Sequence, residues 1–470
     1  MEKRTAAMIC LMLASLVGAC DDDSTPSPDA GDGAANADAP TDGGAGDVGD
    51  DGAIVTNRPV LRPVTDALIG QLQVPAGFRV DVLARGLTQP RMLAVGPDGS
   101  LYVTSPMTSQ VRRLVDLDAD GDMSDAGENT VVLDEDDDPA LAGVHGIAIA
   151  AGKMYLASIK AVFVATLTAG VPTGLMKLVG DLPDGGQHPN RTIALGPDGK
   201  LYVTVGSDCN SCPESDSEHA TFLRFNVDGT VATNPANPTH PLLAHNPNAT
   251  VTPRVFASGL RNTLGFDWAP GTNELWGADH GSDGLGDDVP PDEINRIAGG
   301  AAYGWPYCFG DRQPDFTADD PSASMSKAAY CPKTVGAIAG FPAHSAPIAF
   351  VFYRATQFPA AYRGGAFVAL RGSWNRSVPT GYKVVYVPFA GGVPSGAPQD
   401  VLSGFLIENG AAQFGRLAGL AVDGSGSLLV SEDTNGVIYR LRYGADVDGG
   451  AVDGGDGGAD AVADAPDSTQ

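Results

Sequence analysis

One short phrase recurs along the chain and constrains the fold more than any other feature. Gly-Pro-Asp-Gly-Ser-Leu-Tyr-Val occupies residues 96–103, and Gly-Pro-Asp-Gly-Lys-Leu-Tyr-Val occupies residues 196–203. Weaker copies lie at residues 150–156, 269–276 and 423–430. Each copy follows an alternating apolar run, so it predicts a strand, an Asp-Gly hairpin turn and a second strand. A hairpin repeated at this spacing predicts small sheets arranged radially around a central channel, as in a β-propeller.

The strand-like segments fall into six clusters, which predict an all-β, six-bladed β-propeller over residues 54–444. The clusters span residues 78–117, 131–167, 175–227, 255–297, 348–389 and 401–441. Long inserts at residues 234–252 and 299–347 interrupt the spacing. The opening strand at residues 78–83 could close the ring against the last blade. Ligands of such folds bind at the mouth of the channel, where we expect the functional site.

The first twenty residues carry an export signal. Lys3 and Arg4 precede a short apolar run that ends in small residues before Cys20. This pattern predicts a secretory signal peptide. The cysteine directly after Gly18 and Ala19 resembles a bacterial lipobox, so we expect lipidation of Cys20, with an ordinary signal peptide as the alternative. The protein is then exported and held by a lipid anchor, facing the periplasm or the cell surface.

Two acidic segments flank the predicted propeller. Residues 21–53 and 445–470 consist largely of Asp, Gly and Ala, and they contain too few large apolar side chains to offset the entropy of ordering. They predict a disordered tether and a disordered tail. Ten acidic residues lie in residues 21–52 and seven in 445–470, without Lys or Arg, so these ends carry most of the net charge of −28. This acidity argues against a nucleic-acid partner.

Four cysteines remain after the signal. Cys209 and Cys212 form a Cys-x-x-Cys motif, and Cys308 and Cys331 form a second pair within an insert. An even set in an exported protein predicts a disulfide in each pair. A metal site is the weaker alternative, because no second Cys-x-x-Cys or His-x-x-x-His motif accompanies them.

Polar residues precede the inner strands of several predicted blades. His188 precedes the third and Arg261 and Asn262 the fourth, while Arg371 and Arg416 each lie at a strand start, in the fifth and the sixth. Cations and amides converging on one channel predict a planar, anionic ligand, and a histidine there suits a general base. Taken singly, each is as well explained by a loop histidine bonded to a carbonyl or by an arginine paired within a blade. His145 also begins a predicted inner strand, in the second blade, but we expect no neighbouring arginine there.

Two acidic, glycine-containing stretches suit Ca²⁺, which prefers oxygen ligands. The first contains Gly281 and Ser282 and continues to Asp292 and Glu293. The second begins Asp116-x-Asp118-x-Asp120 and resembles the start of an EF-hand loop, although Glu128 falls one place beyond the usual twelfth position. A solvated acidic loop is the alternative for both.

Several strings together resemble the soluble pyrroloquinoline quinone (PQQ) dependent sugar dehydrogenases. They are residues 188–202, Arg261-Asn262, residues 292–295 and residues 300–306. Residues 372–376 and 381–384 resemble the sorbosone dehydrogenase branch most. The resemblance covers roughly the whole predicted propeller. Two departures concern the cofactor: Arg371 stands where glucose-type members carry Lys, and Ala418 stands where they carry a second arginine of the last blade.

The resemblance implies PQQ at the channel mouth, a sugar substrate and a separate electron acceptor, either a cytochrome or a quinone. His188 would remove the proton of the sugar hydroxyl, with Arg261 and Asn262 near the quinone and Arg371 and Arg416 as further cofactor contacts. Carbonyls at Gly281 and Ser282 would hold the cofactor's Ca²⁺. A further Ca²⁺ would involve Asp292, Glu293 and Tyr303.

Two other functions are consistent with such a propeller. One is a Ca²⁺-dependent hydrolase of the lactonase type, and the other is a non-catalytic module that binds carbohydrate or protein, because a fold alone does not determine function. A lactonase requires carboxylates that point into the channel. The arginines before the inner strands instead favour the anionic cofactor.

Overall fold

The computed structural model describes residues 47–48, 54–55, 57–183 and 186–444, all within one unit of the chain, residues 36–470. The predicted signal, the Cys20 lipidation site, the acidic tail and nearly all of the tether lie outside these residues. β1 (Asp47–Val48), inside the predicted tether, pairs with β2 (Ile54–Val55), at the start of the predicted propeller, and composition did not predict this pairing. Among the described residues, no helix is long and apolar enough to cross a membrane.

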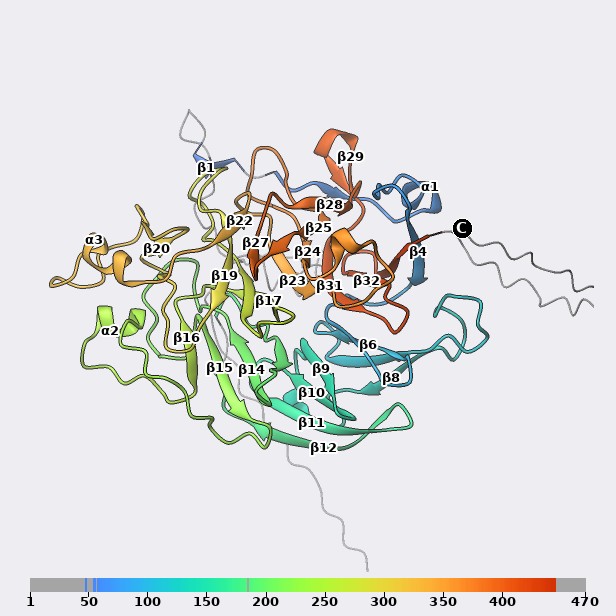
Figure 1. Ribbon diagram of the computed structural model, residues 1–470, viewed down its shortest axis with the longest axis horizontal. Helices are drawn as coiled ribbons and strands as arrows, with labels where there is room; N and C mark the ends of the chain where they lie inside the picture. Colours follow the sequence, from blue (N-terminus) through green and yellow to red (C-terminus); the bar gives the residue numbers. More distant parts are fainter. Residues whose placement is uncertain (1–46, 49–53, 56, 184–185, 445–470) are drawn as a thin grey trace, which may run out of the picture. The chain divides into compact units, whose positions relative to one another are not determined.

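Strands dominate the described residues, which confirms the all-β prediction (Figure 1). The α-helices are single turns: α1 (Asp66–Ile69), α2 (Pro241–His245) and α3 (Lys327–Tyr330). The described part contains six four-stranded antiparallel sheets. The first three sheets, each given from its first strand outward, are β5–β8 (Leu93–Val95, Leu101–Ser105, Gln110–Leu114, Asn129–Leu133), β9–β12 (Gly146–Ala150, Lys153–Ala157, Val162–Thr168, Val171–Val179) and β13–β16 (Ile193–Leu195, Lys200–Val205, Thr221–Asn226, Val255–Ser258). The fourth is β17, β18, β19 and β22 (Thr263–Trp268, Leu275–Asp279, Asp292–Ile297, Ala339–Phe341), and the fifth is β23, β24, β25 and β28 (Pro347–Phe352, Ala366–Leu370, Lys383–Val387, Gln399–Leu402). The sixth is β31, β32, β33 and β4 (Leu417–Val422, Leu428–Glu432, Val437–Tyr443, Phe78–Ala84).

The first strands of the sheets face a common centre. Successive first strands contact one another, from β5 to β9 to β13 and from β17 to β23 to β31 and back to β5. A cavity of about 750 Å³ is lined by residues from the first strand of every one of these sheets, among them Leu93, Ile147, Ile193, Gly265, Phe350 and Leu420. Sheets arranged radially around such a channel form a β-propeller.

The Asp-Gly turns behave as the recurring phrase predicts. Gly99 and Gly199 have φ values of +83° and +69°, a region that favours glycine. The preceding aspartates, Asp98 and Asp198, accept hydrogen bonds from the backbone N–H two residues on, at 3.2 and 3.1 Å. Each turn therefore joins the first and second strands of its sheet.

The predicted blade boundaries are displaced by one strand. The outermost strands β8, β12, β16 and β28 belong to the preceding sheet, whereas the sequence clusters grouped them with the next one. An outermost strand is separated from its hairpin partners by a loop, so spacing alone assigns it wrongly. The predicted closure is confirmed: β4 pairs with β33, with Phe78 opposite Tyr443, and β4 is therefore not part of the first blade.

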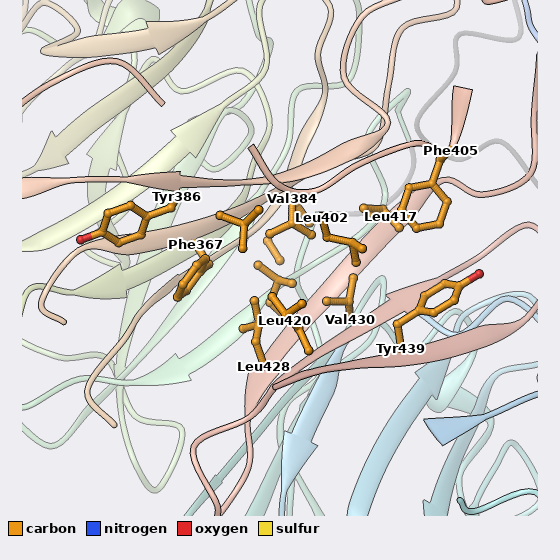
Figure 2. Packing of buried hydrophobic residues seen from close by; sticks show 14 of the residues in the cluster. Phe367, Val384, Tyr386, Leu402, Phe405, Leu417, Leu420, Leu428, Val430 and Tyr439 are labelled. Atoms are coloured by element: carbon orange, nitrogen blue, oxygen red, sulfur yellow. The ribbon is translucent and has the colours of Figure 1, made fainter. Parts of the chain in front are cut away.

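The hydrophobic core lies between neighbouring sheets. Figure 2 shows one such interface, where Phe367 and Val384 of the fifth sheet face Leu420 and Val430 of the sixth. A fully buried side chain of this size contributes roughly 1.5–3 kcal/mol to the stability of the fold. This packing makes a rigid support for the loops that join the strands, and those loops carry the site.

Candidate functional site

A partly open pocket lies among loops of the last three sheets. Its walls come from the loops before β17, β23 and β31, from the loop between β18 and β19 together with the start of β19, and from the loop after β24. Most of the lining side chains are charged or polar. They are Arg261, His280, Gly281, Asp283, Asp292, His344, Ala346, Arg371, Trp374, Asn375 and Arg416.

Three arginines surround one carboxylate at this pocket. Asp433 Oδ2 lies 2.5 Å from Arg91 Nη1 and 3.1 Å from Arg371 Nε, and all three side chains are almost fully buried. Arg416 donates to the carbonyl of Gly372 at 2.7 Å. Burial alone would raise the pKa of Asp433, but the charges of Arg371, Arg91 and Arg416 hold it below its ordinary value.

The neighbouring acid does not balance these charges. Glu432 is buried, and burial raises its pKa to about 7. Its side chain accepts a hydrogen bond from the backbone N–H of Arg416 at 3.0 Å. Three guanidinium groups thus lie near one ionised carboxylate, Asp433, and near Glu432, whose pKa is raised.

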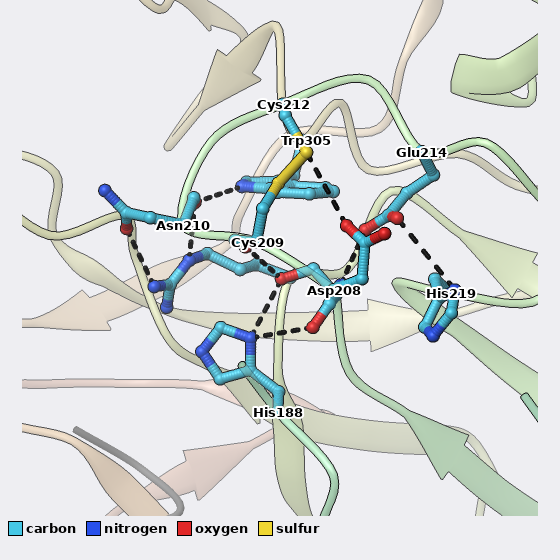
Figure 3. Close-up of a disulfide and its surroundings, with 10 residues drawn as sticks. His188, Asp208, Cys209, Asn210, Cys212, Glu214, His219 and Trp305 are labelled. Carbon is cyan, nitrogen blue, oxygen red and sulfur yellow. Dashed lines mark hydrogen bonds and ion pairs between the residues drawn. A yellow bond between two sulfur atoms is a disulfide. The ribbon is translucent and has the colours of Figure 1, made fainter. Parts of the chain in front are cut away.

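The short loop closed by the Cys209–Cys212 disulfide carries Asn210 (Figure 3), and Asn210 holds Arg261. Its Nε donates to the carbonyl of Asn210 at 2.9 Å, and its Nη2 donates to Asn210 Oδ1 at 2.9 Å and to Asp283 Oδ2 at 3.0 Å. Asn210 also bonds the backbone of Asp283 in both directions, and its carbonyl accepts from Trp305 Nε1 at 3.3 Å. Asn210 therefore fixes both the arginine and its counter-ion.

Both predicted disulfides are confirmed. Cys209 joins Cys212, and Cys308 joins Cys331. The second bond lies in the insert between β19 and β22 and packs beside Tyr307 and Tyr330. The two bonds thus differ in place: the first is next to Arg261, and the second braces an insert.

His188 is only 5% exposed and does not line the pocket. Its Nδ1 lies 2.9 Å from Ser207 Oγ and 3.0 Å from the Ser207 carbonyl, while the Ser207 N–H donates to the carbonyl of Arg261 at 2.8 Å. One residue therefore links the predicted base to the predicted quinone contact. His280 and His344 are the histidines that line the pocket.

Gly206 lets His188 approach the other half of the predicted pair. A Cβ at Gly206 would lie 2.4 Å from the Cβ of His188 and 2.9 Å from Asn262 Oδ1. Asn262 is buried and does not line the pocket itself. The distance between its Nδ2 and Nδ1 of His280 is 3.3 Å. Arg261, Arg371 and Arg416 thus reach the pocket wall, whereas His188 and Asn262 do not line it. The predicted strand start at Arg371 is wrong, because Arg371 follows β24.

The predicted Ca²⁺ ligands divide between two places. Gly281 and Asp292 line the pocket, and the Gly281 N–H donates to Asp292 Oδ1 at 3.0 Å. The Ala346 N–H donates to Asp292 Oδ2 at 2.8 Å, yet burial raises the pKa of Asp292 to about 7. Ser282 is buried but does not line the pocket.

The predicted group of Asp292, Glu293 and Tyr303 is not assembled by their side chains. Successive residues of β19 point to opposite faces, so Glu293 turns away from Asp292 and accepts from Asn295 Nδ2 at 2.9 Å. Burial raises the pKa of Glu293 to about 8. The Tyr303 hydroxyl donates to the Arg296 carbonyl and accepts from the Ala298 N–H, within a separate hydrophobic cluster.

The Asp116–Asp120 stretch does gather its carboxylates. One oxygen each of Asp116, Asp118 and Glu128 lie within 4.8 Å of one another, and so do those of Asp118, Asp120 and Asp125. Glu128 is buried and accepts from the Leu117 N–H at 2.7 Å. Its position one place late in the sequence is therefore accommodated by the loop.

Sequence reasoning missed two residues of the site, Asp433 and His344. A shared pattern could have found the first. Asp279 ends β18 and accepts from the N–H groups of Arg261 and Asn262, while Glu432 ends β32 and accepts from the N–H of Arg416. An acid at the end of a second strand thus holds the arginine that begins the same sheet, and Asp433 directly follows one such acid.

His145 also differs from its sequence interpretation. Nε of Arg91, a residue distant in sequence, lies 3.4 Å from Nε2 of His145. Nδ1 of His145 lies 3.1 Å from the carbonyl oxygen of Arg191. The prediction that His145 lacks an arginine neighbour is therefore wrong, because the first and second sheets bring the two residues together.

The sequence of this chain is similar to a known protein family and to several known proteins. A family model described as TrAA12-like matches residues 72–444. An uncharacterized protein of Borreliella burgdorferi is 28% identical over 414 residues, which cover 83% of this chain and 96% of that protein. A pyrroloquinoline quinone-dependent sugar dehydrogenase of Hypocrea jecorina is 25% identical over 418 residues, which cover 79% of this chain and 89% of that enzyme.

Solved structures share the fold. The calcium structure of Trichoderma reesei Carbohydrate-Active Enzymes Family AA12 superposes with a TM-score of 0.65 at 23% identity, over 82% of this chain and 99% of that chain. The holo form of the pyranose dehydrogenase PQQ domain from Coprinopsis cinerea superposes with a TM-score of 0.60 at 21% identity, over 82% of this chain and 98% of that chain.

Proposed function

The chain belongs to the TrAA12-like family, and from that premise we propose that it is a PQQ-dependent sugar dehydrogenase built as a six-bladed propeller. The six sheets around the central cavity are its blades. The observation that carries the function is the group of arginines at and beside the pocket: Arg91 and Arg371 bind Asp433, and Arg416 lies close enough to lower the pKa of that carboxyl. A ligand with several carboxylates would balance them.

The residues present fit PQQ. Arg261, Arg371 and Arg416 reach the pocket wall, the planar ring of Trp374 lies beside them, and the buried Oδ1 of Asn375 has no hydrogen-bond partner in the structure. PQQ carries three carboxylates and would supply the two-electron acceptor for the sugar. Arg371 and Arg416 would hold carboxylates of the cofactor, and Arg261 would stabilise negative charge on its carbonyl oxygens.

The loss of an arginine at position 418 is offset from another sheet. Ala418 packs against Leu264 and Ile348 near the channel. Arg91, which precedes β5, reaches the same Asp433 that binds Arg371. The pocket region therefore retains three guanidinium groups despite Ala418.

His188 is the proposed base for the hydroxyl proton of the sugar. Ser207 orients its ring through Nδ1, and Ser207 is bonded in turn to the carbonyls of Cys209 and to the backbone of Arg261. A fixed imidazole beside the cofactor contact supports this role, which further requires the ring to come within hydrogen-bond reach of the sugar hydroxyl. We assign the sorbosone-type branch on residues 372–376 and 381–384.

Ca²⁺ is proposed at two places. The first is the pocket, where Gly281 and Asp292 offer oxygen atoms beside Asp283. The second is the loop of Asp116, Asp118 and Asp120, with Glu128 as a further ligand. Hard oxygen ligands of this kind suit Ca²⁺. The protein is further proposed to be exported, anchored through Cys20 and served by a separate electron acceptor.

The central experiment is a titration of PQQ into EDTA-treated protein and into protein loaded with Ca²⁺, followed by dye reduction with a panel of aldoses. We expect saturable binding that Ca²⁺ strengthens, and turnover with at least one sugar. Arg371→Leu should weaken PQQ binding by about tenfold to a hundredfold, because a hydrogen-bonded ion pair is lost. Absence of saturable binding in both samples would remove the dehydrogenase and leave the lactonase, to which Asp283 and Asp292 at the pocket wall would be suited.

The two disulfides should separate stability from cofactor binding. Replacing Cys308 and Cys331 by serine opens the larger loop and should cost about 3 kcal/mol of unfolding free energy, against about 2 kcal/mol for Cys209 and Cys212. PQQ affinity should follow the opposite order, because only the Cys209–Cys212 loop presents Asn210 to Arg261. Denaturation curves and PQQ titrations of the two double variants test this. Equal losses of PQQ affinity would show that Asn210 does not depend on the disulfide.

A further inference from the structure

A second cluster of ligand-type side chains lies outside the pocket, on the loop between β14 and β15. Figure 3 shows Asp208, Glu214 and His219 gathered on one side of the Cys209–Cys212 disulfide. One oxygen of each carboxylate and one ring nitrogen of His219 lie within 4.8 Å of one another. None of the three lines the pocket, and the proposed sugar oxidation does not use them.

The cluster is buried and its hydrogen bonding is incomplete. Glu214 is 7% exposed and His219 is 6% exposed. Oε1 of Glu214 accepts from the Asp208 N–H at 3.1 Å, but Oε2 has no hydrogen-bond partner and faces Nδ1 of His219 at 4.0 Å. A buried carboxylate oxygen without a donor is costly unless a cation or a proton compensates it.

The spacing suits an ion between the side chains. Two ligand atoms that each lie about 2.1 Å from one ion can be at most about 4.2 Å apart. The 4.0 Å between Glu214 Oε2 and His219 Nδ1 is too long for a hydrogen bond and falls inside that limit. Three ligand atoms around one ion lie about 3.4–3.6 Å apart in tetrahedral or trigonal geometry, so these side chains, which now lie within 4.8 Å of one another, would move together by up to about 1.4 Å on binding.

A further carboxylate stands at the edge of the cluster. Asp216 Oδ2 lies 2.8 Å from His219 Nδ1, and its Oδ1 accepts the backbone N–H groups of Glu218 and His219. Asp216 is half-exposed and contacts the same ring nitrogen, Nδ1, so it would complete the coordination shell of an ion bound there.

We propose that Asp208, Glu214 and His219 form a binding site for one divalent transition-metal ion. Imidazole nitrogen combined with two carboxylates suits Zn²⁺ or Mn²⁺, whereas Ca²⁺ prefers oxygen ligands alone. The ion joins residues on both sides of the Cys209–Cys212 loop, which presents Asn210 to Arg261. It therefore has a structural role: it fixes the loop that orients the arginine.

The test uses the full oxidised protein, without PQQ or sugar, so its outcome does not depend on the proposed dehydrogenase. Zn²⁺ is added in the presence of millimolar Ca²⁺, and bound metal is measured by calorimetry and by elemental analysis after gel filtration. We expect one tightly bound Zn²⁺. Glu214→Gln and His219→Gln should each weaken it by at least about a hundredfold, since loss of a ligand costs more than loss of its outer partner.

Asp118→Asn is the matched control, because it removes a carboxylate from the other acidic loop and should leave Zn²⁺ binding unchanged. Thermal unfolding checks that the variants fold. If a variant does not fold, anomalous diffraction at the zinc edge from crystals of the wild-type protein still locates the ion. The proposal is overturned if wild-type protein binds no Zn²⁺, if the Glu214 and His219 variants bind it as wild type does, or if the ion is found elsewhere. Binding that arises only after reduction would assign the ion to Cys209 and Cys212 instead.

Discussion

Replacement of His188 by alanine is expected to lower sugar-dependent turnover by about two to four orders of magnitude, the range for loss of a positioned general base. The affinity for PQQ should change little, because the arginines of the pocket remain in place. Wild-type turnover should also decline on the acid side of neutrality, since a protonated imidazole cannot accept a proton. Steady-state rates across pH, together with PQQ titrations of both proteins, measure these effects.

His145 provides the internal control for this experiment. It too is a buried histidine before a first strand, but its ring nitrogens face Arg91 and the carbonyl of Arg191. His145→Ala should therefore reduce stability more than turnover. If His344→Gln or His280→Gln abolishes turnover while His188→Ala retains it, the base lies on the pocket wall and our assignment of His188 is wrong.

Replacement of Asp433 by asparagine is expected to lower the free energy of unfolding by about 3–5 kcal/mol, the cost of leaving a buried ion pair without one partner. Arg91 and Arg371 both bind this carboxylate in a buried environment, and Arg416 lies close enough to stabilise its charge. Urea denaturation of the wild type and the variant at neutral pH measures the difference. Surface ion pairs such as that of Arg62 with Glu408 should contribute far less to the free energy of unfolding.

The effect of Asp433 should depend on pH in a defined direction. Its pKa is held below the ordinary value by the arginines, so the folded state favours the ionised form. The stabilisation is complete above the unfolded pKa of about 3.9 and is lost as pH falls through the lower pKa of the folded protein. The gap between wild type and Asp433→Asn should therefore narrow only below about pH 4. A gap that stays constant into that range would show that Asp433 acts through packing rather than through charge.

Local turn chemistry made the sheet content predictable. The Asp-Gly turns at residues 98–99 and 198–199 require positive φ at glycine, and that requirement is visible in the sequence. The assignment of outermost strands such as β8 and β28 was not predictable from spacing, because pairing of an outer strand depends on long-range contacts. Closure of the last sheet by β4 was predictable from the sequence, because a lone strand before the first hairpin had no other partner.

The site was predictable where one short motif supplied the residue. Arg261, Arg371 and Arg416 each lie next to a strand boundary in a recognisable string, and each reaches the pocket. Asp433 and His344 were missed because their roles arise from contacts between sheets. The same limit explains Tyr303: the resemblance grouped it with Asp292, whereas strand alternation and the insert separate their side chains.

The pairing of β4 with β33 matters for how the protein is synthesised. Phe78–Ala84 leaves the ribosome early, and its partner Val437–Tyr443 is among the last parts of the propeller to follow. Until then β4 has no sheet to join, and β5 has no neighbour on the side of β31. An unpaired edge of this kind is prone to association and to proteolysis. Premature termination anywhere before β33 should therefore yield an open ring that cellular quality control removes, so that only the completed chain accumulates.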